Sequence, residues 1–331
     1  MKNNYKKTLV IICIVLFIGV LRFSQNRDDF STYNPEWNGG NQIKNELSEN
    51  HTVISMPFTD DLSAYDPGTT AFIILRPENN FSQKDMGIIK KFIENGGLLI
   101  VADDFGSGND LLNILTTQIA FSNMLMLDDV NYWENITFPI ANAYMTNVSN
   151  ITMNFPTSLI IKDNSVKILA NSSTFSWLST GNMERGFGGS YPVIASTASG
   201  KGAIIAIADP SIFINSMLPM NDNGLLLGKL VENRDIIIFD EKMRMPLISV
   251  IQYHIRNNPR VQYLFAASVI LFSYIFMNRE RLYPIKVKEK DTQNYIYALD
   301  EKEIISDIVK RNKWDDGKIQ LFKNKLEGGN K

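Results

Sequence analysis

One stretch of about thirty residues limits the possible folds more than any other part of the chain. An apolar run at residues 71–76 is followed by Ser82, which precedes an amphipathic segment at residues 83–94. A Gly-Gly turn ends that segment, and a second apolar run follows at residues 98–102. Strand, capped helix, glycine turn and strand together predict a βαβ unit whose two strands are parallel neighbours.

The same alternation returns later in the chain. The apolar run 203–208 is followed by a helical stretch, by a predicted helix at 224–233 and by a last short strand at 235–239. Residues 120–200 are instead rich in Asn, Ser and Thr and carry only short β-prone runs, which indicates an antiparallel extension. The expected fold class is therefore α/β, a flavodoxin-like parallel sheet with helices on both faces and this extension.

Acidic residues follow the predicted strands where each strand ends. Because the carboxyl ends of parallel strands share one edge of a sheet, several carboxylates would meet there and suit a hard cation or a polar ligand. Asn215 and Ser211 lie on the helical stretch behind this edge and are further candidates. The residues at the strand ends are Glu78, Asp103, Asp104, Asp209 and Asp240.

Each of these acids also has a purely structural explanation. Asp209 stands before a proline, which is typical of an N-cap followed by proline at the first helical position. Asp222 or Asn223 would cap the next helix in the same way, and Asp103 and Asp104 would fold their own polar loop. We favour capping over a ligand site, and the identity of any metal stays open.

Nucleophilic catalysis lacks its usual groups in this sequence. The one cysteine, Cys13, lies in the first apolar run, and there is no Gly-x-Ser-x-Gly elbow. The two histidines, His51 and His254, stand in no metal-binding frame. The glycine-rich tract 186–189 is interpreted as a turn, because no helix start follows it. The sequence therefore predicts a protein that is not an enzyme and uses no cofactor.

Two apolar runs frame the middle of the chain. Residues 8–23 follow a basic start at residues 1–7 without a small-residue cleavage pattern, which predicts an uncleaved anchor. Residues 261–277 carry no charge and precede a basic stretch, which predicts a second transmembrane helix. Because basic residues flank both outer ends, we expect a two-pass protein of the cell membrane with both termini in the cytoplasm.

The region 24–258 would then be the main, extracytoplasmic α/β domain. It contains no cysteine, so it must rest on its hydrophobic core alone. Asn-x-Ser/Thr sequons in this region are glycosylation candidates. They are Asn50, Asn80, Asn135, Asn147, Asn150 and Asn171.

The tail, residues 278–331, would be cytoplasmic and is strongly charged. Within it, residues 300–312 place four aliphatic side chains along one side of a predicted helix. Such a helix either docks a partner or lies on a membrane, or it is a solvated helix that ends the chain. Both interpretations stay open.

Four stretches, taken in order, resemble the family called domain of unknown function 4350. They are YNPEWNGG, IENGGLLIVADD, GKGAIIAIADPSIFINSM and the closing IIIFDE. The resemblance covers most of residues 30–245 and implies a membrane-anchored, glutamine amidotransferase-like fold of archaeal type with no assigned activity. Family members often carry histidines after the FDE-like stretch, where this chain has Lys-Met-Arg-Met at 242–245. Family members are often found alongside MoxR-type ATPases and von Willebrand-type proteins, so the resemblance implies that this protein occurs with them too.

The expected function is therefore non-catalytic. We expect a membrane-anchored, extracytoplasmic binding or scaffold protein that contacts the lipid bilayer and a protein partner in a membrane complex. Two alternatives stay open, a metal-dependent hydrolase that uses the acidic sheet edge and a receptor for a solute or glycan. The net charge of -2 argues against a nucleic-acid partner.

Overall fold

The computed structural model describes residues 28–77, 81–116, 118–179, 184–242, 244–246 and 248–251, together with parts of 260–274 and 306–311 and the segment 316–327. The chain divides into two compact units, Met1–Asn258 and Pro259–Lys331. The described part of the second unit includes the helix α9, Asp316–Glu327. The candidate sites below all lie in the first unit.

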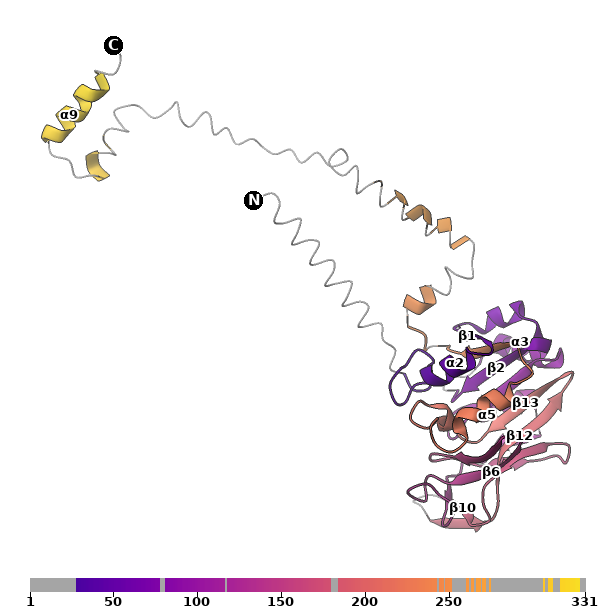
Figure 1. Ribbon diagram of the computed structural model, residues 1–331. Coiled ribbons are helices and arrows are strands. Elements are labelled where there is room, and N and C mark those ends of the chain that lie inside the picture. Colours follow the sequence, from indigo (N-terminus) through magenta and orange to yellow (C-terminus); the bar gives the residue numbers. More distant parts are fainter. Residues whose placement is uncertain are drawn as a thin grey trace. The chain divides into compact units, whose positions relative to one another are not determined.

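A nine-stranded sheet organises the first unit (Figure 1). One half is parallel and contains, in spatial order, β1 (Thr52–Met56), β14 (Ile236–Asp240), β2 (Thr70–Leu75), β3 (Leu98–Ala102) and β13 (Gly202–Ile207). Antiparallel pairing continues the sheet through β12 (Pro192–Ser199), β9 (Lys167–Asn171), β6 (Ile140–Met145) and β7 (Val148–Thr152). Two smaller sheets contain β11 (Arg185–Gly188), β10 (Ser176–Ser179) and β5 (Met126–Asp128), and β4 (Ile119–Phe121) with β8 (Leu159–Ile161).

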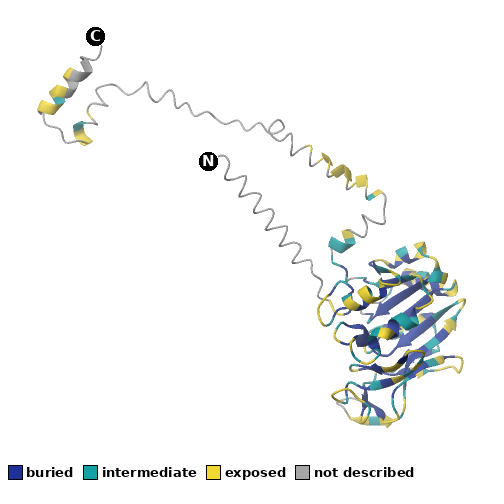
Figure 2. Ribbon diagram, in the orientation of Figure 1, coloured by how far each residue is buried: buried dark blue, intermediate teal, exposed yellow. Residues whose placement is uncertain are grey.

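Short helices connect and cover the strands. They are α2 (Asn41–Leu47), η1 (Thr59–Ala64), η2 (Pro67–Thr69), α3 (Gln83–Glu94), α4 (Gly108–Leu115), η3 (Pro210–Phe213) and α5 (Asn223–Leu230). The core lies on the parallel strands, which are mostly dark blue in Figure 2. Phe72 of β2 and Phe239 of β14 are almost wholly buried there. Removing these large apolar side chains from water is the main force that holds the sheet to its helices.

The predicted βαβ unit is confirmed as β2, α3 and β3. Ser82 begins α3 with a capping box, in which its hydroxyl accepts from the amide of Asp85 at 3.1 Å and the Asp85 carboxylate accepts from the amide of Ser82 at 3.0 Å. The two strands pair in parallel, with Ile73 opposite Ile100. Every residue of both strands is buried, as expected for parallel strands covered on both faces.

The predicted fold class is wrong in its balance of strands and helices. We expected a flavodoxin-like or glutamine amidotransferase-like parallel sheet with helices on both faces, but the sheet is large and its second half is antiparallel. The reason lies at Gly200, whose φ of 59° lets β12 turn back directly into β13. The extension therefore joins the main sheet. The stretch after Asp209 is only the short 3-10 helix η3.

The predicted membrane topology is also contradicted. Among the described residues, no helix combines the length and the apolar character that crossing a bilayer requires. Within the described residues, this finding contradicts the predicted two-pass protein, in which the runs 8–23 and 261–277 cross the membrane, both termini are cytoplasmic and 24–258 is extracytoplasmic. The run 261–277 is described only in part. Residues 8–23 lie outside the described part of the chain.

The outer edge of β7 is covered by the loop that leads into α5. The Asp222 carboxylate accepts from the amides of Ser149 at 2.8 Å and Asn150 at 3.0 Å. The Asn223 side chain accepts from the amide of Thr152 at 3.0 Å and donates to its carbonyl at 2.9 Å. Asp222 stands at the N-cap of α5 but makes no side-chain cap bond there. Both residues therefore satisfy a strand edge that would otherwise be open to another chain.

Candidate functional site

The acidic edge of the sheet is the first candidate site. Asp103 follows β3 and Asp209 follows β13, and these are adjacent parallel strands. Both residues are almost completely buried, and they stand at the same edge of the sheet because the two strands are parallel. What they do there depends on their hydrogen-bond partners.

Asp103 holds the loop that follows β3 through hydrogen bonds to that loop's backbone. Its two oxygens accept from the amides of Gly106 at 3.0 Å and Gly108 at 2.6 Å. Burial raises the pKa of Asp103 to about 6, against the lowering effect of these amide donors. A side chain at Gly108 would collide with the carboxylate, so the glycine allows the close approach. Both carboxylate oxygens are therefore occupied by the protein.

Both carboxylate oxygens of Asp209 also accept hydrogen bonds from backbone amides. One oxygen accepts from the amide of Ser211 at 2.7 Å, which confirms the predicted N-cap of η3. The other accepts from the amide of Asn154 at 2.6 Å. Burial raises the pKa of Asp209 to about 8. The segment that carries Asn154 also donates from the amide of Thr157 to the Ala208 carbonyl at 3.0 Å, so the chain itself occupies the end of β13.

The remaining acids do not complete a ligand set. The carboxylate of Asp104 accepts from the amide of Phe105 at 2.6 Å, and its charge raises the pKa of both Asp103 and Asp209. Asp240 ends β14, two strands away from β3, and is partly exposed. Burial raises its pKa, while the charges of Arg244 and Lys242 lower it. Within the described residues, no three His, Cys, Asp or Glu side chains are placed to hold a metal ion.

The two further candidates, Asn215 and Ser211, also make hydrogen bonds within the protein. Asn215 donates to the carbonyls of Glu36 at 2.6 Å and Asn34 at 3.3 Å and accepts from the amide of Gln42 at 2.9 Å. It therefore ties the residues before α2 to the end of η3. Ser211 supplies its amide to Asp209. Glu78 and the sequon at Asn80 lie outside the described residues.

A buried polar cluster at the ends of β1 and β14 was not predicted. Glu241 accepts from the hydroxyl of Ser31 at 2.8 Å and from the amide of Thr32 at 2.5 Å. The hydroxyls of Thr32 and Ser55 lie 2.7 Å apart, and Lys44 donates to Ser55 at 2.9 Å. Burial raises the pKa of Glu241 and lowers that of Lys44. The acidic strand end at 240–241 was visible in the sequence, but its partners lie far away along the chain.

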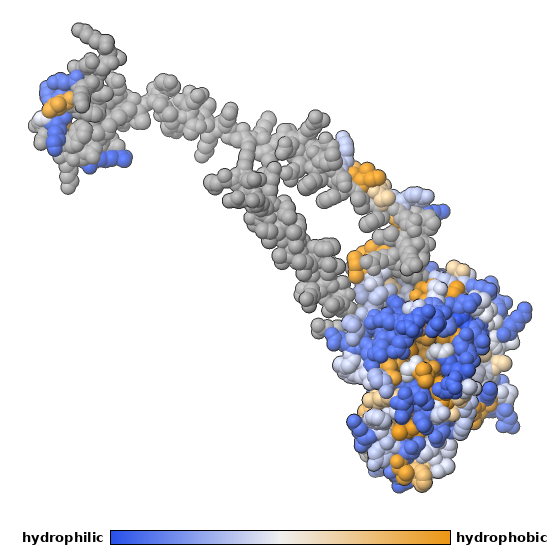
Figure 3. Space-filling view, in the orientation of Figure 1, coloured by the Kyte–Doolittle hydropathy of each residue, from blue (hydrophilic) through white to orange (hydrophobic). Residues whose placement is uncertain are grey.

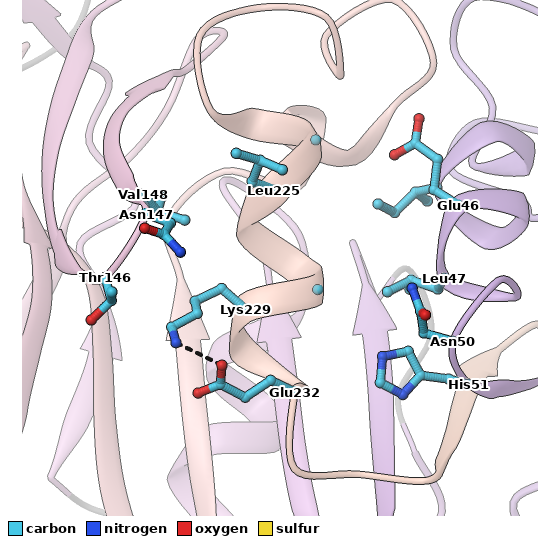
Figure 4. Close-up of a pocket in the computed structure, with 13 residues that line it drawn as sticks. Glu46, Leu47, Asn50, His51, Thr146, Asn147, Val148, Leu225, Lys229 and Glu232 are labelled. Atoms are coloured by element: carbon cyan, nitrogen blue, oxygen red, sulfur yellow. Dashed lines mark hydrogen bonds and ion pairs between the residues drawn. The ribbon is translucent and has the colours of Figure 1, made fainter.

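A groove next to α5 is the second candidate site (Figure 4). Its volume is about 610 Å³, within the range of small-ligand and peptide pockets. Figure 4 shows α5 between two walls, one formed by α2 and the turn after it and the other by the turn between β6 and β7. The lining residues are Ile43, Glu46, Leu47, Asn50, His51, Thr146, Asn147, Val148, Gly224, Leu225, Gly228, Lys229 and Glu232.

The groove combines open backbone with a few polar groups. Gly224 and Gly228 are one helical turn apart, and a side chain at Gly228 would meet no atom within 4 Å. Leu225 is 58% exposed. Lys229 is paired with Glu232 at 2.6 Å, and the His51 Nδ1 lies 2.7 Å from the Arg234 carbonyl oxygen. The spacing Gly-x-x-x-Gly at 224–228 was the available sequence signal, but three distant segments form the groove.

Comparison with known proteins gives a family. The family profile of the domain of unknown function DUF4350 matches residues 32–231, which is more than half of the chain. No curated protein matches the sequence.

Solved structures give only distant likenesses. The mmIFT52 N-terminal domain aligns at 15% identity and a TM-score of 0.48, covering 62% of this chain and 95% of that one. The cytoplasmic protein STM1381 from Salmonella typhimurium LT2 aligns at 13% identity and a TM-score of 0.35, covering 60% and 80%. A beta-galactosidase from Bacillus circulans sp. alkalophilus aligns at 12% identity and a TM-score of 0.27, covering 58% of this chain but 23% of that one. These TM-scores support no functional argument.

Proposed function

Because the chain belongs to the DUF4350 family, a domain of unknown function, we propose its role from its own geometry: it is a non-catalytic binding domain that holds a segment of a protein partner in the groove beside α5. The observation that carries this proposal is the open face of α5, where Gly228 leaves backbone uncovered next to the exposed Leu225.

The acidic sheet edge supports the non-catalytic part of the proposal. A general base needs a carboxylate free to take a proton from a substrate, and a cation needs carboxylate oxygens as ligands. The oxygens of Asp103 and Asp209 instead accept short hydrogen bonds from the protein's own amides. Freeing them would require unfolding the loop after β3 or moving the segment at residues 153–158.

The groove suits a peptide for steric and electrostatic reasons. A glycine in a helix lets another backbone approach closely, because no Cβ stands in between. Leu225 offers apolar surface at the same place. Among the described groove residues, Lys229 and Glu232 neutralise each other, while the Glu46 carboxylate accepts a hydrogen bond from the neutral side-chain amide of Gln42. The expected ligand segment therefore carries an apolar side chain and a basic residue for Glu46.

The test is to fill the groove. Peptides of twelve residues are selected from a random displayed library on the wild-type protein, synthesised, and measured by calorimetry. We expect Gly228→Phe to weaken their binding at least tenfold, because the new ring takes the space that the peptide uses. Glu46→Lys should weaken the basic peptides and leave uncharged ones unchanged.

Gly87→Phe is the matched control. Gly87 is an exposed glycine in α3, and a side chain there would also meet no atom within 4 Å. Both variants should fold like the wild type by circular dichroism. The proposal fails if no peptide is enriched, or if the enriched peptides bind Gly228→Phe as tightly as Gly87→Phe.

The finer relation of this family to glutamine amidotransferase-like proteins of archaeal type stays a proposal. It is supported by the residue pattern given above, while the family match extends only to DUF4350. That the chain binds a protein partner is likewise a proposal. The peptide-binding experiment tests it.

A further inference from the structure

The open face of the antiparallel half carries a row of asparagines. In the sheet register Asn142 of β6 lies opposite Asn150 of β7 on one side and Asn171 of β9 on the other. Residues directly opposite each other in antiparallel strands point to the same face and have Cβ atoms about 5 Å apart. Their neighbours Ala141 and Ile151 point to the other face and are buried in the core. The three amides therefore form one line across three strands.

The amides in this row have few partners within the protein. Asn142 and Asn150 are exposed, and neither side chain makes a hydrogen bond to another described residue. The Asn171 oxygen is shielded from water and has no hydrogen-bond partner among the described residues. The amides that a ligand can reach are therefore those of Asn142 and Asn150, which are exposed on the surface.

An aromatic ring stands beside the row. Tyr144 is 61% exposed, and its hydroxyl lies 3.4 Å from the Asn171 amide nitrogen. Of all residues in β6, β7 and β9, only Lys167 is charged, and it lies at the far end of β9 from Asn171. The row itself is thus polar, contains no charged side chain and is flanked by an aromatic ring, with the Asp222 carboxylate at the edge of β7.

We propose that Asn142, Asn150 and Tyr144 form a binding surface for a neutral carbohydrate. An asparagine amide both donates and accepts, so it matches a pair of neighbouring sugar hydroxyls. An exposed tyrosine ring offers an apolar face and a polar tip, which suits the C–H face of a pyranose ring. The separation of the amides is comparable to the width of one sugar unit, so the row accommodates a short oligosaccharide.

The chemistry of the surface favours this ligand over the other classes. A nucleic acid or an anionic polymer would require basic side chains, which the row lacks. An added protein strand would require a free strand edge, and the edge of β7 is already bonded to Asp222 and Asn223. The surface is separate from the proposed peptide groove in its residues, so the two proposals stand independently.

The experiment uses full-length protein made in a bacterial host without N-glycosylation, because Asn150 and Asn171 are also sequon residues. Cellohexaose, xylohexaose, mannohexaose and chitohexaose are titrated by calorimetry, with oligogalacturonate as the anionic probe. We expect at least one neutral hexasaccharide to bind and the anionic probe not to bind. Tyr144→Ala should weaken binding about tenfold, and Asn142→Ala should also weaken it, whereas Tyr144→Phe keeps the ring and should stay within about threefold.

Phe105→Ala is the control, since Phe105 is an exposed aromatic residue in the loop after β3. It should bind the saccharide like the wild type. The proposal is overturned if none of the four neutral hexasaccharides binds, or if Tyr144→Ala binds as tightly as Phe105→Ala. It is also overturned if Gly228→Phe abolishes saccharide binding, because the ligand would then occupy the groove.

Discussion

At the scale of single residues, the buried aspartates carry most of the pH dependence expected of this domain. An aspartate in an unfolded chain loses its proton near pH 4, whereas Asp103 holds it to about pH 6 and Asp209 to about pH 8. Between these values the folded state binds more protons than the unfolded state. Stability must therefore fall as the pH rises through this window, and it levels off above pH 8.

The first prediction follows from Asp209. Urea unfolding should give a lower free energy of unfolding at pH 8 than at pH 5, and Asp209 alone should contribute a slope of up to about 1.4 kcal/mol per pH unit. Asp209→Asn should flatten this slope most clearly between pH 7 and 8, because the pKa values of Asp103 and Asp240 are raised only to about 6 and about 7. The exposed Asp110 provides the control, since Asp110→Asn should keep the wild-type slope. Equal slopes in all three proteins would show that Asp209 is already ionised at pH 5.

At the scale of elements, the sealed edge of β7 is the feature with the largest predicted effect. The Asn223 side chain makes three hydrogen bonds, to the amide and carbonyl of Thr152 and to the carbonyl of Met217 at 3.0 Å. All lie in a buried position, so removing the amide leaves backbone groups without partners.

The second prediction is that Asn223→Ala lowers the free energy of unfolding by about 2–4 kcal/mol and promotes self-association. The exposed edge of β7 would then pair with the same strand of another molecule. Chemical unfolding and light scattering measure the two effects. Asn45→Ala, on the exposed side of α2, should change neither quantity. An Asn223→Ala protein that is as stable and monodisperse as Asn45→Ala would show that the loop does not protect the edge.

Some helices and strands could be predicted from the sequence alone, and others could not. Local signals were sufficient for β2, α3 and β3, because the Ser82 cap, the apolar period and the glycine turn all act within about thirty residues. That Asp103 and Asp209 each follow the end of a parallel strand came from the same reasoning. The distance of Asp240 did not, because β14 inserts between β1 and β2, and strand order is not encoded locally. The groove and the Glu241 cluster join segments far apart in sequence, which no periodicity reveals.

At the scale of the whole domain, the Glu241 cluster connects the beginning of the described chain with the end of the sheet. Ser31 and Thr32 bond to a carboxylate that follows β14. Arg244 donates to the Arg76 carbonyl at 2.5 Å, and Arg76 lies 3.7 Å from Asp29. The segment at residues 28–34 is therefore held in place by residues at 241–244.

The third prediction is that Glu241→Ala loosens this segment. Hydrogen exchange at residues 30–34 should become roughly tenfold to a hundredfold faster, as expected for losing bonds to a charged acceptor. Exchange in β2 and β3 should stay unchanged, because those strands make no contact with the cluster's hydrogen bonds. Unchanged exchange at Thr32 would mean that the rest of the domain holds the segment.

The position of β1 has a consequence for how the domain is completed during synthesis. In the nine-stranded sheet β1 is an outer strand, and its one strand neighbour is β14. The ribosome therefore releases β1 long before its partner exists, and β2, β3 and β13 can assemble without it. Until Ile236–Asp240 emerges, the apolar residues of Thr52–Met56 have no sheet to join and are open to chaperones or to other chains. The first strand of the sheet to be made is thus among the last to be placed.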